Sequence, residues 1–319
     1  MAAHDTIPQG ESLNELLDRA HEDLVAHRTD SAITHLERAL ALDFDHPDVA
    51  TTLKYASFWK EREALLQQIG SEFEQGEYLL SQWNTFSRFV ERVGRASEPW
   101  MASIRAHVFG MAMERFESLL DASGGADAEL LLRIGRCHKA LGHYDTARQR
   151  LEQAGTHRRD DAAILAELAD CYALINETQR AKAFFREAFF VSPSRIDLDS
   201  LESPLIRRLI DRVRDEGYEQ PALAEWVPIY GVVYGVFSVK RELRSIEYGK
   251  LRQSIYALER EVHEHGNTEI DSAKKARLIN RYFWLIDHYV NTGEERSKID
   301  EVRLKIRQLS LKAYEAFTH

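Results

Sequence analysis

The sequence predicts an all-α protein, and three observations support this prediction. Of its 319 residues only 7 are proline and 16 are glycine, as a protein built from helices requires. Alternating runs of β-branched residues, which would indicate strands, are almost absent. Residues 128–193 contain two copies of one sequence pattern, which lie 34 residues apart. A fixed period of this length is typical of a helix–turn–helix unit that stacks on its neighbours, so we expect a helical-hairpin solenoid.

The two copies agree in aliphatic and small residues at fixed positions. The matching pairs are Leu131 and Leu165, Gly135 and Ala169, Ala147 and Ala181, and Ala154 and Ala188. In the middle of the unit Gly142 corresponds to Asn176. Asparagine tolerates the left-handed backbone conformation better than most residues, so both copies can make the same turn between two helices.

This pattern resembles the tetratricopeptide repeat family. In that family Gly135 and Ala169 would lie where the two helices of a unit approach most closely, and the alanines would fill small-residue sites of the second helix. Leu131 and Leu165 stand where the family often has tryptophan, and the tyrosine of the second turn is missing. The resemblance covers about a fifth of the chain. It implies a groove, lined by the first helices of successive units, that binds a protein partner.

Residues 1–127 are expected to form degenerate hairpins of the same kind. A first unit spans 11–46, with one helical stripe around Leu16 and another around Leu36. A helix between Asp48 and Gln68 does not fit the period, and a second degenerate unit is predicted around residues 69–81. Ser97-Glu98-Pro99 starts a helix that is either one long helix or a broken pair, because Gly110 lies in its middle.

Residues 128–200 are predicted to be two well-formed units, and 201–319 a C-terminal helical domain that caps the array. A helix opens at Ser203-Pro204, and three further segments show apolar residues with helical spacing. These stripes run through residues 248–262, 279–290 and 299–313. Each is expected to be one amphipathic helix of an antiparallel layer, which would cover the exposed end of the solenoid.

Residues 226–239 contain no charged side chain. Fourteen residues are too few to span a bilayer as a helix, so we expect no membrane segment. One interpretation is a buried helix that locks the array to the C-terminal part. The alternative is an exposed surface for a homo-oligomer or a partner. The residues of that surface, or of a pocket wall, would be Trp226, Tyr230, Gly231, Tyr234 and Gly235.

Charge and cysteine content restrict the classes of partner and the compartment. The net charge is −10, and most of the negative charge lies in residues 1–100, which argues against a nucleic acid partner. Cys137 and Cys171 lie 34 residues apart and are expected to be buried, reduced thiols. The first ten residues have no apolar signal segment, so we expect a cytoplasmic protein if the chain is complete.

The sequence contains no motif of a known catalytic or metal site. There is no His-Glu-x-x-His, no Gly-x-Ser-x-Gly, no phosphate-binding glycine loop and no Cys-x-x-Cys. We therefore expect neither enzymatic activity nor a metal or other cofactor. An enzyme with scattered active-site residues is the least favoured class.

Charged residues on the first helices of the two copies are the candidate binding residues. Stacking would bring Arg133 beside Glu167 and Arg136 beside Asp170, which allows ion pairs between the units. The resemblance places Arg136, Lys139, Asp170 and Ala173 at groove positions, with Arg133 and Glu167 as neighbours. These charges either neutralise one another or bind acidic groups of a peptide. The acidic residues of the second copy make a clamp for a partner's terminal carboxylate improbable.

The sequence therefore predicts a non-enzymatic scaffold that binds a protein or peptide partner in this groove. The alternative function is a ligand-binding accessory protein in which the C-terminal helices close the groove into a pocket. Trp226, Tyr230 and Tyr234 would then form an aromatic wall.

Overall fold

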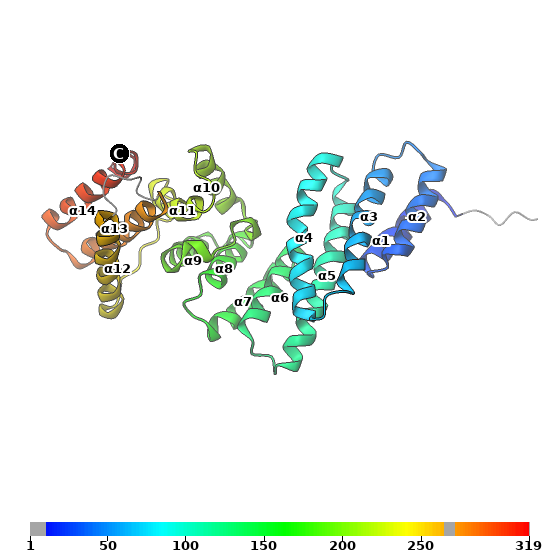
Figure 1. Cartoon of the computed structure of the whole chain (residues 1–319), viewed down its shortest axis with the longest axis horizontal. Helices are drawn as coiled ribbons and strands as arrows, with labels where there is room; N and C mark the ends of the chain where they lie inside the picture. Colours follow the sequence, from blue (N-terminus) through cyan, green and yellow to red (C-terminus); the bar gives the residue numbers. More distant parts are fainter. Residues whose placement is uncertain (1–10, 265–271, 319) are drawn as a thin grey trace, which may run out of the picture. The chain divides into compact units, whose positions relative to one another are not determined.

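A computed structural model describes residues 11–264 and 272–318 of the chain (Figure 1). Over these residues the structure contains fifteen α-helices, two short 3-10 helices and no strand, which confirms the all-α prediction. The chain forms two compact units, Met1–Arg150 and Leu151–His319. The division falls inside helix α7 (Tyr144–His157).

The first unit is built from six helices and the start of α7. They are α1 (Leu13–Val25), α2 (Thr29–Leu42), α3 (Val49–Leu66), α4 (Glu72–Val93), α5 (Glu98–Ala122) and α6 (Ala128–Ala140). Helices α1 and α2 form a hairpin, α4 and α5 form a second one, and α1 also packs on α5.

The second unit begins with the end of α7 and continues through the C-terminal helices. Its elements are α8 (Ala162–Leu174), α9 (Thr178–Val191), the 3-10 helices η1 (Pro193–Arg195) and η2 (Leu198–Ser200), α10 (Pro204–Asp215), α11 (Ala222–Val233), α12 (Ser245–Glu264), α13 (Ser272–Thr292), α14 (Arg296–Leu309) and α15 (Leu311–Thr318). Helix α8 packs along α9, and α13 contacts α11, α12 and α14.

Six of the described helix ends share one turn geometry. The residues at these turns are His27, Gly124, Gly142, Asn176, Gly217 and Gly293, with φ angles of 60°, 81°, 80°, 65°, 90° and 67°. In each turn the next residue donates its backbone N–H to the carbonyl five residues before it, over 2.8 to 3.4 Å. This is the Schellman arrangement, in which a left-handed residue ends a helix and satisfies its last carbonyl groups.

The residues around this turn explain why the helices can pack closely. The fifth, ninth and twelfth residues after the turn are small, large and small in three of the hairpins. These sets are Ala32, Leu36 and Ala39; Ala147, Leu151 and Ala154; and Ala181, Phe185 and Ala188, and all nine are fully buried. The α1–α2 hairpin therefore has the same register as the two copies recognised in the sequence. Histidine at the turn position concealed this register, because glycine and asparagine are the residues expected there.

Helices α3, α4 and α5 depart from the hairpin pattern. The prediction of a second degenerate unit around residues 69–81 is wrong, because Gly76 and Ser81 lie inside the 22-residue helix α4. A Cβ atom on Gly76 would lie 2.4 Å from the ring of Phe116, so this glycine serves a close helix crossing and not a turn. Helix α5 is one continuous helix of 25 residues. Gly110 in its middle makes room for the ring of His27, 2.7 Å from an added Cβ.

A buried histidine connects three helices of the first unit. His107 of α5 is fully buried, and its Nε2 lies 2.7 Å from Oε1 of Glu63 on α3. Its Nδ1 lies 3.1 Å from the carbonyl oxygen of Leu24 at the end of α1. Because a polar ring buried without partners is costly, these two contacts fix the position of α5 against α1 and α3.

Helix α13 forms the centre of the second unit. Ile279, Phe283 and Ile286 of the predicted stripe are buried, whereas Val290 at its end is 52% exposed. Val290 is exposed because it lies in the last turn of α13, near the end of the helix at Thr292. The stripe predicted over 299–313 is divided between α14 and α15, since the first of these helices ends before Ser310.

The end of α9 is held by side chains of α13. Asn280 donates its amide to the carbonyl of Phe189 over 3.0 Å, and Arg281 donates to the carbonyl of Phe190 over 2.6 Å. One turn earlier, Arg186 pairs with Asp287 of α13 and donates to the carbonyl of Phe237. The contacts of Asn280 and Arg281 satisfy two of the carbonyl groups that a helix leaves free at its C-terminus.

We predict that Gly142→Ala destabilises the chain through its backbone conformation alone. No atom lies within 4 Å of a Cβ added at Gly142, but its φ of +80° is unfavourable for alanine. The expected loss in the free energy of unfolding is about 1–2 kcal/mol, measured by denaturant titration. Gly70→Ala is the matched control, because Gly70 has equal space and no positive φ. An equal loss in both variants would contradict the assigned turn.

Candidate partner-binding surface

Helices α6 and α8 carry the groove residues predicted from the sequence, and both begin with an aspartate cap. The side chain of Asp127 accepts the backbone N–H groups of Glu129 and Leu130 over 2.8 and 3.2 Å. Asp161, 34 residues later, accepts the corresponding groups at the start of α8 over 2.9 and 3.4 Å. A carboxylate at this position stabilises the positive end of the helix dipole. The caps fix the start of each first helix.

The three basic positions of α6 differ in how far they reach the surface. Arg133 donates to Glu77 of α4 over 2.5 Å and pairs with Glu129 over 2.8 Å, so its charge is balanced within the unit. Lys139 is only 1% exposed. Arg136, like Arg133, is half-buried.

The acidic positions of α8 are fully buried and hold the chain before α10. Asp170 accepts the backbone N–H groups of Glu202 and Ser203 over 2.7 and 2.8 Å. Glu167 accepts the hydroxyl of Ser200 over 2.6 Å. Ser203 is the residue that precedes α10, so Asp170 supplies an acceptor to the start of that helix. Sequence spacing alone did not reveal this role, because the donors lie more than thirty residues along the chain.

The remaining predicted position, Ala173, lies near the end of α8 and is half-buried. Of the six groove positions, Arg136 and Ala173 are thus two that are half-buried.

The uncharged segment is mostly internal to the second unit. Trp226, Tyr230 and Gly231 are buried in α11, which ends at Val233 and does not extend to residue 239. The indole N–H of Trp226 donates to the hydroxyl of Ser272 over 2.9 Å. A Cβ on Gly231 would lie 2.3 Å from the ring of Phe237, so the neighbour that approaches this glycine is the following loop of the same chain.

Tyr234 and Gly235, at the end of the same segment, are exposed. Tyr234 is 38% exposed, and the guanidinium of Arg212 lies 4.9 Å from its ring centre. Gly235 has a φ of +68°, which ends the helical conformation. The two residues could contact solvent or a partner, whereas Trp226 and Tyr230 could not without rearrangement.

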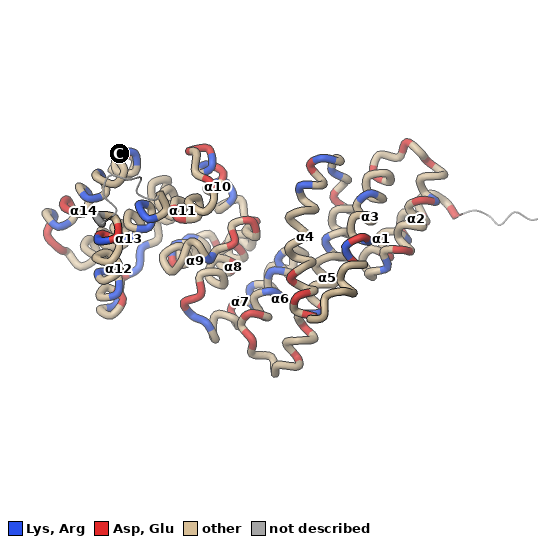
Figure 2. The backbone as a smooth tube through the Cα atoms, viewed as in Figure 1, with Lys and Arg blue, Asp and Glu red and all other residues tan. Residues whose placement is uncertain are grey.

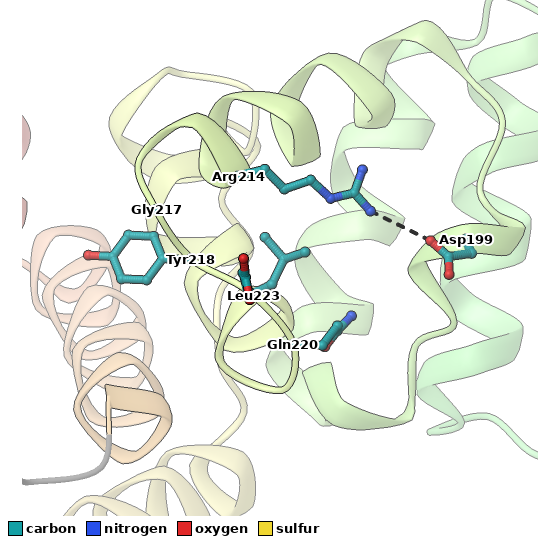
Figure 3. A pocket seen from close by; sticks show the side chains of 7 residues that line it. Asp199, Arg214, Gly217, Tyr218, Gln220 and Leu223 are labelled. Carbon is teal, nitrogen blue, oxygen red and sulfur yellow. Dashed lines mark ion pairs between the residues drawn. The ribbon is translucent and has the colours of Figure 1, made fainter. Parts of the chain in front are cut away.

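A hollow of about 340 Å³ lies at the turn between α10 and α11 (Figure 3). Its lining residues are Asp199, Arg214, Gly217, Tyr218, Glu219, Gln220 and Leu223. Asp199 and Arg214 face each other across it at 3.6 Å. Trp226, Tyr230 and Tyr234 do not line it. Figure 3 shows the ring of Tyr218 directed away from the ion pair, and this ring stacks on Trp226 with centres 4.4 Å apart.

The described residues offer neither a metal-binding group nor a membrane-spanning helix. Within 11–264 and 272–318, no group of three or more His, Cys, Asp or Glu side chains is placed to hold a metal ion. No helix in these ranges is both long and apolar enough to cross a bilayer. Cys137 and Cys171 are buried and form no disulfide, as predicted, and burial raises the pKa of the Cys137 thiol.

Basic and acidic residues are interspersed along the helices (Figure 2).

Comparison with known families agrees with the repeat geometry. Residues 109–166 and 140–201 match the tetratricopeptide repeat family, so the matched segment includes α6 to α9. No curated protein is significantly similar to the chain. Residues 109–201 are thus a tetratricopeptide-repeat segment. Repeats of this family generally mediate protein–protein interaction and are generally non-enzymatic.

Asp170→Ala is predicted to destabilise the second unit. The variant leaves two backbone N–H groups without their charged acceptor, so we expect a loss of about 2 kcal/mol or more in the free energy of unfolding. Asp160→Ala is the control, because this neighbouring aspartate is exposed. Chemical denaturation followed by circular dichroism gives both values. Equal stability of Asp170→Ala and wild type would contradict the capping role.

Gly231→Ala is predicted to lower stability without changing the mass in solution. The added methyl group meets the buried ring of Phe237, and overpacking of this kind costs about 1–3 kcal/mol. Gly249→Ala makes the same change in the exposed face of α12 and should raise stability by about 0.5–1 kcal/mol. Light scattering measures the mass. A changed mass with unchanged stability would show that Gly231 lies in an interface between molecules.

Proposed function

We propose that the protein is a non-enzymatic scaffold that binds a protein or peptide partner through its tetratricopeptide-repeat segment. The observation that carries the proposal is the family match over residues 109–201. The segment consists of helical hairpins with small, fully buried residues at fixed positions. Such hairpins leave the outer faces of their first helices available for a partner.

The accessible residues of the two first helices define the proposed contacts. On α6 we choose Arg136, which is half-buried, whereas Lys139 is buried. On α8 it is Ala173, because Glu167 and Asp170 bind the segment that leads into α10. The proposal therefore assigns recognition mainly to shape and to contacts of small and apolar groups, with one cation on α6.

The buried thiols support a further proposal on the compartment. Cys137 and Cys171 are buried and form no disulfide. Such cysteines fit a reducing environment, and we propose the cytoplasm.

The test begins with the partner and then changes one helix face at a time. Affinity purification from the source cells, followed by mass spectrometry, gives candidate partners, and direct binding is measured with the purified proteins. Arg136→Glu should raise the dissociation constant about tenfold, which corresponds to a loss of about 1.4 kcal/mol in binding free energy. Its control is Arg92→Glu, which makes the same charge change on the exposed end of α4 in the same unit.

The second variant tests α8 separately. Ala173→Glu adds a charged side chain at a half-buried position of α8 and should also weaken binding. Ala183→Glu, on the equally half-buried surface of α9, is the control. The proposal fails if both test variants are folded and bind the partner with the wild-type dissociation constant.

A further inference from the structure

Arg252 of α12 lies among three tyrosine hydroxyl groups. Its Nη1 donates to Tyr248 over 3.2 Å and to Tyr289 over 3.4 Å, and its Nη2 donates to Tyr256 over 2.5 Å. Tyr248 and Tyr256 lie one helical turn to either side of Arg252 on α12. Tyr289 comes from α13, which packs along α12. The cluster therefore belongs to the second unit and is separate from the repeat segment.

Arg252 has no carboxylate partner among the residues that the structure describes. Other arginines of this unit do: Arg186 pairs with Asp287, Arg241 with Glu187 and Arg277 with Glu225. The described partners of Arg252 are phenol groups instead, in a chain of net charge −10. Its positive charge is solvated by neutral oxygen atoms and is not cancelled.

The guanidinium retains two donors for a ligand. It carries five N–H groups, and three of them are used by the tyrosine oxygens. The remaining groups are the Nε–H and one Nη2–H, which have no partner in the described part of the chain. Nε and Nη2 form one edge of the planar group, and this edge binds carboxylate and phosphate oxygens in bidentate fashion.

The tyrosines add donors in other directions. A phenol oxygen that accepts from arginine keeps its own proton for donation. The hydroxyl groups of Tyr248 and Tyr289 both accept from the same nitrogen, Nη1 of Arg252. The hydroxyl proton of Tyr256 has no acceptor within the described residues. Burial raises the pKa of Tyr289, which keeps this phenol neutral and able to donate.

The cluster has a fixed inner side and an open outer side. Tyr289 is 7% exposed, and the ring of Tyr248 stacks on His288 with centres 4.2 Å apart. Tyr256 is 58% exposed. In the α13–α14 turn, Glu294 pairs with Lys298 over 2.7 Å, so its charge is balanced. The exposed Tyr256 leaves the outer side of the cluster open to a ligand.

We propose that Arg252, Tyr248, Tyr256 and Tyr289 form a binding site for a tetrahedral oxyanion, namely phosphate or a phosphate monoester. The free guanidinium edge would bind two of its oxygens, and the Tyr256 hydroxyl would bind a third from outside that plane. A planar carboxylate can use the edge but gains less from Tyr256. Preference for phosphate follows from the number and direction of the donors.

The experiment uses the full chain and measures binding by titration calorimetry with inorganic phosphate, O-phosphoserine and acetate. Arg252→Gln should weaken phosphate binding about tenfold or more, because the charge-assisted bidentate contact is lost. Tyr256→Phe should weaken phosphate binding about threefold and leave acetate binding nearly unchanged, since one neutral hydrogen bond is removed. Arg296→Gln removes an exposed cation of α14 and should leave all three affinities unchanged.

The two phosphate ligands distinguish the source of the anion. Tighter binding of inorganic phosphate supports a free ion, and tighter binding of O-phosphoserine supports a phosphorylated side chain. The proposal is overturned if phosphate does not bind saturably, or if Arg252→Gln and Tyr256→Phe both bind it like wild type. It is also overturned if acetate binds as tightly as phosphate in wild type and in Tyr256→Phe. Because Tyr256 is exposed, its variant tests the site even if Arg252→Gln does not fold.

Discussion

Three helical hairpins of this protein each depend on one residue in the left-handed backbone conformation. At His27, Gly142 and Asn176 this conformation ends the first helix and sends the chain back along it. For a residue with a Cβ atom the conformation costs about 1–2 kcal/mol, so it occurs only where packing compensates. The compensation is the fully buried alanine and large apolar residue that follow at fixed spacing. The turn conformation therefore requires the buried contacts of the second helix, and these contacts form only if the turn sends the chain back along the first helix.

Internal polar contacts continue the repeat segment into the C-terminal helices. A solenoid leaves the carbonyl groups of its last helix and one apolar face exposed. Here Asn280 and Arg281 satisfy the carbonyls at the end of α9, and Asp170 accepts the N–H groups that precede α10. The same residues determine where α10 starts and where α13 lies. The C-terminal helices thus supply hydrogen-bond partners to the α8–α9 hairpin and also cover its apolar face.

The sequence predicted features that depend on local residue types and missed those that depend on distant segments. Both buried thiols and the helices of residues 11–46 and 128–193 follow from local residue types. The second degenerate unit predicted around residues 69–81 was wrong, because Gly76 lies at a close helix crossing inside α4, and such a glycine has no distinguishing neighbours in the sequence. Burial of Asp170 was also missed. Its partners lie in a non-repeating segment, so no period could indicate them.

The distribution of charge limits how this protein can recognise a partner. In the repeat segment, Arg133 is balanced by Glu77 and Glu129, and the carboxylates of α8 are used by the chain itself. Attraction between fully balanced surface charges is weak and further reduced by salt. Recognition by the proposed contact residues of the repeat segment would therefore rest on shape more than on charge. Arg252, whose described partners are phenol groups and not carboxylates, keeps its attraction for an anion, which is why the proposed oxyanion site lies on α12 and not in the repeat segment.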